Sequence, residues 1–340
     1  MEILYIIGNG FDLAWGMKTS YPDFYSFLKD KDHKNNPLMR QLIQEITEKN
    51  ELWSDMEEAL GKFTKKIEKV DSFQKLYIDL SNYLSEYLSQ QSATFNPTDL
   101  DKEKFEYDIY HPLFFLDEGD KIKIDNYFRN KYQRLTAIYG SVNYMIERGK
   151  HRIMTLNYTN TIERIGKYYD DIIHVHGTLD ETIIMGVDNE GQIENEKFRV
   201  DDVKDFFVKE QSNEVMKLVR HNHCRSWIKS AELIILYGVS LGETDAQWWA
   251  LIGEQFRKGI PVIQFLFSPD IDIRHHKQLV GRLERKQRQV FMEKMGFSKN
   301  RKDWPADVNE RLIFVTNSEI FKPSNSINPQ NYYWTFKTPL

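Results

Sequence analysis

The residues Ile3-Leu4-Tyr5-Ile6-Ile7-Gly8-Asn9-Gly10, near the start of the chain, decide the fold. The first five form an almost uninterrupted apolar run, which is typical of a short β-strand that is buried on both faces. The glycine turn that follows runs into residues 11–16 (FDLAWG), which we expect to open with a short helix. A buried strand, a glycine turn and a helix are how an α/β nucleotide site usually begins.

The same combination of a short apolar strand and a polar turn recurs along the chain. The further candidate strands are residues 152–156, 172–175, 183–185, 233–237, 262–267 and 312–315. Brief strands rich in β-branched residues favour a mostly parallel sheet with helices on its faces. We therefore expect the α/β class, with a sheet of about six to seven strands.

Helical segments separate these strands. Apolar residues recur at helical spacing between Phe73 and Leu88, which predicts an amphipathic helix whose stripe packs inside a helical subdomain. A surface for a partner helix or for a second copy of the chain is the alternative. The expected parts are an α/β nucleotide-binding domain (1–20 and 150–320), a helical insertion (21–149), a smaller helical insertion (194–230), and an irregular tail (321–340) pinned by aromatic residues between 332 and 336.

The composition limits the classes of partner. The 340 residues include 46 Lys and Arg and 51 Asp and Glu, which gives a net charge of −5 and a pI of about 6.0. This balance disfavours nucleic acid, because duplex binding rests on neutralising phosphates. No apolar run approaches the ~20 residues of a membrane helix, so we expect a cytoplasmic protein without membrane contact. One cysteine, Cys224, excludes an internal disulfide and a cysteine-built zinc site, and no metal is expected.

Polar turns follow the carboxyl ends of several expected strands. In an open parallel sheet these ends meet at one edge, and ligands bind in the crevice beyond it. The turns contain Gly8-Asn9-Gly10, Asn157, His176-Gly177, Gly186-Val187-Asp188 and Gly238-Val239-Ser240. Their convergence on one edge is the strongest indication of a binding site in the sequence.

Each of these residues also has a purely structural interpretation. The glycines near Gly8 let a phosphate approach the backbone, or they permit a tight corner; Leu13 stands where a dinucleotide fingerprint has its third glycine. Asn157 offers a donor and an acceptor to a water or a ribose hydroxyl, or it caps the helix that starts near Thr161. His176 is a candidate general base, or a structural histidine at the rim.

Several spaced motifs together resemble the AbiH family of bacterial abortive-infection proteins. The matching segments are residues 4–13 (LYIIGNGFDL), 19–24 (TSYPDF), 53–57 (WSDME), 155–159 (TLNYT), 174–177 (HVHG) and 184–186 (IMG). The resemblance extends through about Asp245 and implies a role in phage defence.

Trp53 and Glu57 share one helix face, and we expect a buried ring beside a surface salt bridge. A place in a pocket is the alternative that the resemblance supports.

A more distant resemblance is to sirtuins and to the sirtuin-like domains that consume NAD. The segments that carry it are Gly8, Gly10 and Gly16 with Asp23-Phe24, Thr155-Leu156-Asn157, His176-Gly177 and Gly238-Val239-Ser240-Leu241. It implies a sirtuin- or Rossmann-like fold with NAD as substrate or ligand. Tyr25 stands where sirtuins have arginine, Thr159 replaces an acidic residue, and the four-cysteine zinc module is absent from the sequence. Deacylation of lysine is therefore not expected.

The resemblance implies an anti-phage effector that binds NAD or a related nucleotide and hydrolyses the nicotinamide–ribose bond. Asn157 would position a water and His176 would accept a proton as an oxocarbenium-like cation forms, and electrostatic stabilisation of that cation would ease the loss of nicotinamide. The implied nucleotide-binding residues are Gly8, Asn9, Gly10, Phe11, Asp12, Gly177, Gly238, Ser240 and Asp245. The alternative is a non-catalytic defence protein that senses a nucleotide or binds a partner. A homo-oligomer and a phage-derived trigger are further partners that the resemblance leaves open.

Overall fold

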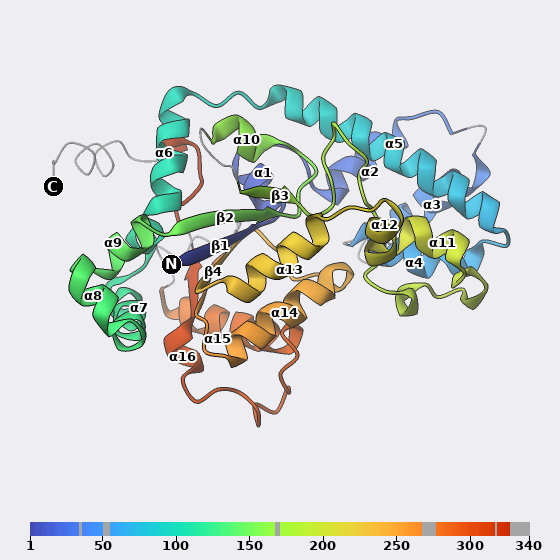
Figure 1. Ribbon diagram of the computed structural model, residues 1–340. Coiled ribbons are helices and arrows are strands. Elements are labelled where there is room, and N and C mark those ends of the chain that lie inside the picture. The colour runs from blue at the N-terminus through green and yellow to red at the C-terminus, as the bar shows by residue number, and fades with distance from the viewer. Residues whose placement is uncertain (34–35, 50–54, 167–170, 267–276, 317, 327–340) are drawn as a thin grey trace.

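The computed structural model describes residues 1–33, 36–49, 55–166, 171–266, 277–316 and 318–326. This part of the chain contains a six-stranded sheet in which every paired strand runs parallel to its neighbour. The strands are β1 (Glu2–Ile7), β2 (Lys150–Thr155), β3 (Ile172–His174), β4 (Leu233–Tyr237), β5 (Val262–Leu266) and β6 (Leu312–Thr316). The predicted α/β class and parallel sheet are confirmed, and helices cover both faces of the sheet (Figure 1).

The order of the strands is β3-β2-β1-β4-β5-β6. The chain runs outward from β1 through β2 to β3, and later returns to the other side of β1 and runs outward through β4, β5 and β6. The segment after β1 leads to α1 (Gly10–Ala14) on one face, whereas the segment after β4 leads to α14 (Ala246–Arg257) on the opposite face. This reversal opens a crevice beyond the carboxyl ends of β1 and β4.

Alternate residues of β1 enter two different cores, because successive side chains of a strand point to opposite faces. Ile3, Tyr5 and Ile7 pack with α1, α6, α7, α9 and α10. Leu4 and Ile6 pack with α13, α14 and α15. These covering helices have the bounds α6 (Asp99–Tyr110), α7 (Glu118–Lys131), α9 (Val142–Glu147), α10 (Thr161–Ile165), α13 (Arg220–Ser230) and α15 (Lys277–Lys294), with α8 (Gln133–Tyr139) and α16 (Val308–Arg311) beside them.

A third core lies away from the sheet. It joins α2 (Tyr21–Lys29), α3 (Pro37–Glu48), α4 (Met56–Phe63) and α5 (Val70–Thr94) to residues 183–208, including α11 (Asp201–Phe207). We call these elements, together with α12 (Lys209–Val215), the helical lobe (Figure 1). The helix predicted from the stripe between Phe73 and Leu88 is confirmed as α5, and the stripe is buried inside the lobe. The division of the chain into domains stays a prediction.

The strand expected at residues 183–185 is wrong. The backbone there finds most of its partners on side chains: the hydroxyl of Tyr77 donates to the Met185 carbonyl at 2.9 Å, and that of Tyr158 donates to the Ile184 carbonyl at 3.2 Å. Because these bonds satisfy the buried polar backbone without a neighbouring strand, the apolar segment crosses irregularly from the sheet to the helical lobe.

The glycine turns after β1 and β4 pack backbone against backbone. The N–H of Gly10 donates to the carbonyl of Gly238 at 2.9 Å, and a Cβ added to Gly238 would lie 2.6 Å from the Cα of Gly10. Gly238 also has a φ of +63°, a conformation that favours glycine. The glycines therefore create a tight corner, whatever else they bind.

We expect Gly238→Ala to lower the free energy of unfolding by roughly 2–4 kcal/mol, because it adds a steric overlap to the left-handed conformation. Gly16→Ala is the matched control: its φ is +75°, but nothing lies within 4 Å of the added Cβ. Gly16→Ala should lower the free energy of unfolding by only about 1–2 kcal/mol. Urea unfolding of both variants tests this, and equal losses would contradict the backbone contact.

A segment near the C-terminus is fixed to α6 and α1. The N–H of Phe321 donates to Oδ2 of Asp108 at 2.7 Å, and the N–H of Ser324 donates to Oδ1 of Asp101 at 2.7 Å. The indole of Trp15 donates to the carbonyl of Phe321 at 2.9 Å. Residues 319–326 are therefore part of the folded unit; residues 327–340, with the expected aromatic cluster, lie outside the described residues, as does Trp53.

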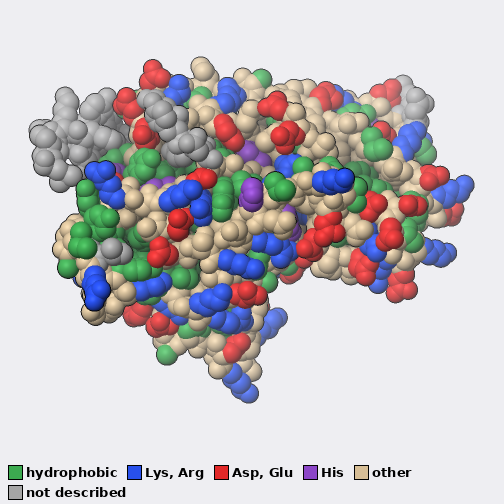
Figure 2. Space-filling view, in the orientation of Figure 1, with side chains coloured by type: hydrophobic (Ala, Val, Ile, Leu, Met, Phe, Trp, Pro, Cys, Tyr) green, Lys and Arg blue, Asp and Glu red, His purple; other side chains and the backbone are tan. Residues whose placement is uncertain are grey.

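Basic and acidic side chains are interspersed over the face shown in Figure 2, in line with the small net charge. Hydrophobic side chains gather at the end formed by α7, α8 and α9, where Ile122 and Ile138 are exposed. Within the described ranges, the helices are all too short or too polar to span a membrane.

Candidate functional site

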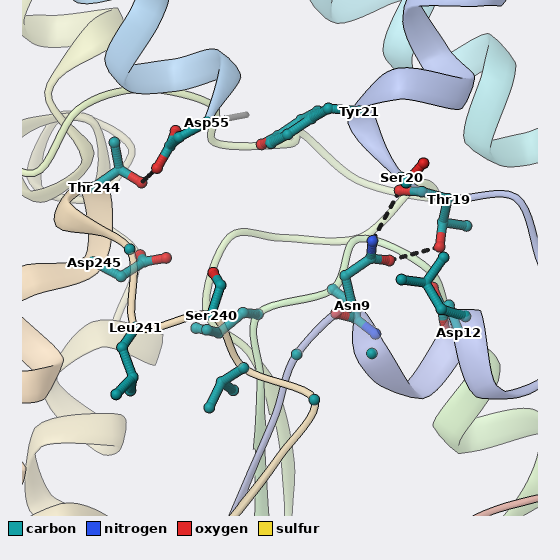
Figure 3. A pocket seen from close by; sticks show the side chains of 18 of the residues that line it. Asn9, Asp12, Thr19, Ser20, Tyr21, Asp55, Ser240, Leu241, Thr244 and Asp245 are labelled. Atoms are coloured by element: carbon teal, nitrogen blue, oxygen red, sulfur yellow. Dashed lines mark hydrogen bonds between the residues drawn. The ribbon is translucent and has the colours of Figure 1, made fainter. Parts of the chain in front are cut away.

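A cavity of about 610 Å³ lies at the carboxyl edge of the sheet, beside the reversal between β1 and β4. It is lined by the segments that follow β1, β2, β3 and β4, by the end of β5, by α15, and by the side of the helical lobe that faces them. Figure 3 shows Asn9 and Asp12 on one side, Asp55 and Asp245 on the other, and Ser240 between them. The size is within the usual range of small-molecule sites, roughly 300–1,000 Å³.

The structure brings most of the predicted site residues to this cavity. Those that line it are Gly8, Asn9, Gly10, Asp12, Asn157, His176, Gly238, Ser240 and Asp245. Phe11 and Gly177 do not line it. The ring of Phe11 is fully buried in the core under the sheet. Gly177 has a φ of +80°, and a Cβ there would lie 2.2 Å from the carbonyl oxygen of Thr182, so this glycine serves a turn.

The side chain of Asn9 is committed to the loop that precedes α2. Its Nδ2 donates to the carbonyl of Thr19 at 3.0 Å, and its Oδ1 accepts from the hydroxyl of Thr19 at 2.6 Å (Figure 3). Ser20 in turn caps α2, since its hydroxyl accepts from the N–H of Asp23. Asn9 therefore shapes one wall of the cavity through the loop it holds.

Asp12 holds the loop after β2 in place. Its two carboxylate oxygens accept from the hydroxyls of Thr159 at 2.6 Å and Thr161 at 2.8 Å. Burial raises the pKa of Asp12 to about 6, although these hydrogen bonds oppose the shift. The carboxylate is thus already bonded on both oxygens, and its contacts favour a role in orienting the loop.

We expect Asp12 to make the protein less stable as the pH rises from about 4 to 7. The folded state binds this proton with a pKa near 6, against 3.8 for an ordinary aspartate, so ionisation in this interval favours unfolding by up to roughly 3 kcal/mol. Asp12→Asn removes this contribution. Urea unfolding of both proteins at several pH values should give curves that converge or cross with pH, and parallel curves would contradict the shift.

Asn157 and His176 line the cavity, and the side chain of each carries a buried polar atom. Asn157 is 6% exposed and His176 is 4% exposed. Among the described residues, neither Nδ2 of Asn157 nor Nδ1 of His176 has a hydrogen-bond partner of ordinary geometry. The Asn157 amide is nevertheless close enough to Asp12 to help lower its pKa. A buried polar atom without a partner is costly, which points to a ligand or water at this wall.

The structural alternatives for these two residues are resolved in part. Asn160, not Asn157, is the residue that precedes α10, so the capping interpretation of Asn157 is wrong. His174 is the last residue of β3 and supports Asn157: its Nδ1 lies 2.8 Å from the Asn157 carbonyl, and its Nε2 lies 2.6 Å from Oε1 of Glu163. His176 lies in the turn beyond the strand.

A buried charge network adjoins His176. Nε2 of His176 lies 2.9 Å from Oδ1 of Asp245, an ion-pair distance at an angle that falls short of a hydrogen bond. The ammonium of Lys209 lies 3.1 Å from the same oxygen and donates to Oε2 of Glu57 at 2.8 Å. Burial alone would raise the pKa of Asp245, yet Lys209 and then His176 hold that pKa well below its ordinary range. Asp245 is therefore ionised at neutral pH.

The cavity has an acidic end, formed by Asp55, Glu57 and Asp245. Burial and then the charge of Glu57 raise the pKa of Asp55, and the same two causes, in that order, raise the pKa of the Tyr21 hydroxyl. Figure 3 shows the Tyr21 hydroxyl directed toward Asp55. With Lys209 as the cation between them, this end keeps a net negative charge and suits a positively charged group.

Lys209 was not predicted from the sequence, and the surroundings predicted for Glu57 differ from those observed. The expected surface salt bridge of Glu57 is wrong, because Glu57 is buried and its partner is the equally buried Lys209. Oε1 of Glu57 also accepts from the N–H of Gly186 at 3.0 Å. The one available signal for Lys209 was its position directly after the apolar run Phe206-Phe207-Val208, where a charged side chain is unusual.

A protein-family comparison agrees with this arrangement of motifs. The family model described as bacteriophage abortive infection AbiH matches residues 4–265, which include most of β1, all of β2 to β4, nearly all of β5 and the lining segments that precede α15. No curated protein and no solved structure matches the chain. Since the matched region is most of the sequence, the chain belongs to the AbiH family.

Proposed function

We propose that this AbiH-family protein is a phage-defence effector that binds NAD or a related nucleotide and hydrolyses the nicotinamide–ribose bond. Family membership supports the defence role. The observation that carries the chemistry is that Asn157 and His176 both line one wall of the cavity, and that Nδ2 of Asn157 and Nδ1 of His176 are buried without a hydrogen-bond partner of ordinary geometry among the described residues.

The arrangement of the sheet supports a nucleotide. The order β3-β2-β1-β4-β5-β6 is that of the doubly wound folds that bind dinucleotides at the reversal of strand order, where the cavity lies. A Rossmann- or sirtuin-like relationship is part of this proposal. The exposed Ser240 and the glycine turns would face the pyrophosphate, because no acidic side chain lies in those turns.

The charge of the cavity supports cleavage through a cationic transition state. The C–N bond breaks with its electron pair leaving on nicotinamide, which departs as a neutral molecule, and positive charge develops on the ribose. The acidic end stabilises this developing positive charge. A water held by Asn157 adds to the anomeric carbon, and Nδ1 of His176 takes its proton. The products are nicotinamide and ADP-ribose.

Release of nicotinamide from NAD by the purified protein tests the proposal. The wild type is assayed beside Asn157→Ala and His176→Ala, with binding followed by thermal shift. We expect release by the wild type and strong loss in both variants. Binding without release, even at high protein concentration, would support the nucleotide-sensing alternative. Neither binding nor release would overturn the nucleotide site itself.

A further inference from the structure

One carboxylate oxygen connects the candidate base to the helical lobe. Oδ1 of Asp245 lies 2.9 Å from Nε2 of His176 and 3.1 Å from Nζ of Lys209. Asp245 belongs to the segment after β4, His176 to the turn after β3, and Lys209 begins α12 of the lobe. The position of the candidate base therefore depends on a residue from outside the sheet.

Lys209 has no donor left for a ligand. An ammonium has three N–H donors, and Nζ of Lys209 has three acceptors: Oε2 of Glu57 at 2.8 Å, the carbonyl of Thr244 at 2.9 Å and Oδ1 of Asp245 at 3.1 Å. Its side chain is only 2% exposed. These contacts suit a residue that acts through its neighbours.

The backbone around Lys209 is fixed from both sides. Val208 forms an isolated parallel bridge with Val187, and the N–H of Lys209 donates to the Val187 carbonyl at 3.0 Å. Glu57, in the first turn of α4, holds the adjacent Gly186 through its other oxygen. These contacts hold the backbone of Lys209 in place and so fix its ammonium beside Asp245.

We propose that Lys209 is a positioning residue for His176: by fixing Asp245, it makes His176 carry its proton on Nε2 and leaves Nδ1 unprotonated. A carboxylate beside one ring nitrogen selects the tautomer with the proton on that nitrogen, as in hydrolases with an Asp–His pair. Neither ring nitrogen has a hydrogen bond of ordinary geometry among the described residues, but Nε2 alone lies at ion-pair distance from Asp245, so Nδ1 is then the atom that accepts the proton of the attacking water. This inference rests on the proposed function for its catalytic meaning.

The tautomer can be read without any substrate. In the full chain labelled with ¹⁵N at the histidine rings, two-dimensional NMR distinguishes the two neutral tautomers, and His176→Gln assigns the His176 signals. We expect the Nε2–H tautomer in the wild type and in Lys209→Arg, which keeps the charge. In Lys209→Met and in Asp245→Asn we expect a mixture of tautomers, because the ionised acceptor is displaced or lost.

The kinetic readout uses the same variants. Lys209→Met should lower the turnover of NAD by roughly 10²-fold, the size expected when a catalytic group is misplaced by about 1 Å, and Lys209→Arg should recover part of it. If Lys209→Met does not fold, Asp245→Asn and Glu57→Gln carry the test, since each alters the network with a nearly isosteric side chain.

The outcomes separate this inference from the proposed function. An Nδ1–H tautomer in the wild type, or a tautomer that is unchanged in both Lys209→Met and Asp245→Asn, overturns the positioning role. A wild type that shows the expected tautomer but never releases nicotinamide overturns the proposed reaction and leaves the positioning of His176 supported.

Discussion

Lys209→Met is expected to lower the free energy of unfolding by about 3–5 kcal/mol, the usual cost of removing one partner from a buried charged pair. Methionine has a similar length, so the loss comes from leaving two carboxylates, Glu57 and Asp245, buried near each other without their cation. Without that cation the pKa of Asp245 rises, and the variant should lose more stability at neutral pH than near pH 4.

A surface pair on the same helix as Glu57 provides the matched control. Lys62 is half exposed and pairs with Glu58 in α4. Because exposed pairs contribute only about 0–1 kcal/mol, Lys62→Met should lower the free energy of unfolding by no more than about 1 kcal/mol. The double variant Lys209→Met, Glu57→Leu should recover part of the loss, since it removes both charges. Equal losses for Lys209→Met and Lys62→Met would contradict a buried network.

His176→Gln is expected to lower nicotinamide release by roughly 10²- to 10⁴-fold, the range for loss of a general base. Glutamine keeps a polar, uncharged side chain of comparable reach, but its amide cannot accept a proton at neutral pH. The assay is the initial rate of release from NAD, with thermal unfolding measured in parallel to show that the variant is folded.

His151 is the matched control for this substitution. It also has a buried Nδ1 without a hydrogen-bond partner among the described residues, but it lies in β2 near the opposite end of the sheet from the cavity. His151→Gln should leave the rate of release within about threefold of the wild type, even if stability falls. A loss below threefold in His176→Gln, with folding intact, would remove His176 from the mechanism.

The sheet could be predicted from the sequence because each strand is a local pattern. Buried parallel strands are continuous apolar runs, and the six that form were predicted to within about two residues at each end. Residues 183–185 have the same apolar pattern but no neighbouring strand. The carbonyls of Ile184 and Met185 accept from the side chains of Tyr158 and Tyr77, and the N–H of Ile184 donates to the His176 carbonyl; no local pattern reveals these partners.

The candidate site was predictable where it follows the strands and not where the helical lobe completes it. Parallel topology alone brings Asn157 and His176 to one edge. The contact between Glu57 and Lys209 joins residues 152 positions apart, and depends on how the lobe packs. Phe11 shows the converse: it lies in a glycine motif, yet helix α1 turns its ring into the core and away from the cavity.

Residues 319–326, which are held against α6 and α1, limit how far the chain can be shortened from its C-terminal end. The family match ends at residue 265, so a protein trimmed to the matched region would retain almost the whole lining of the cavity. It would lose β6, which leaves β5 as a sheet edge with unpaired N–H and C=O groups. It would also lose Phe321, uncovering the ring of Phe11 on the face beneath α6. Such a truncated protein should self-associate through its open edge, so an inactive fragment would report on aggregation rather than on catalysis.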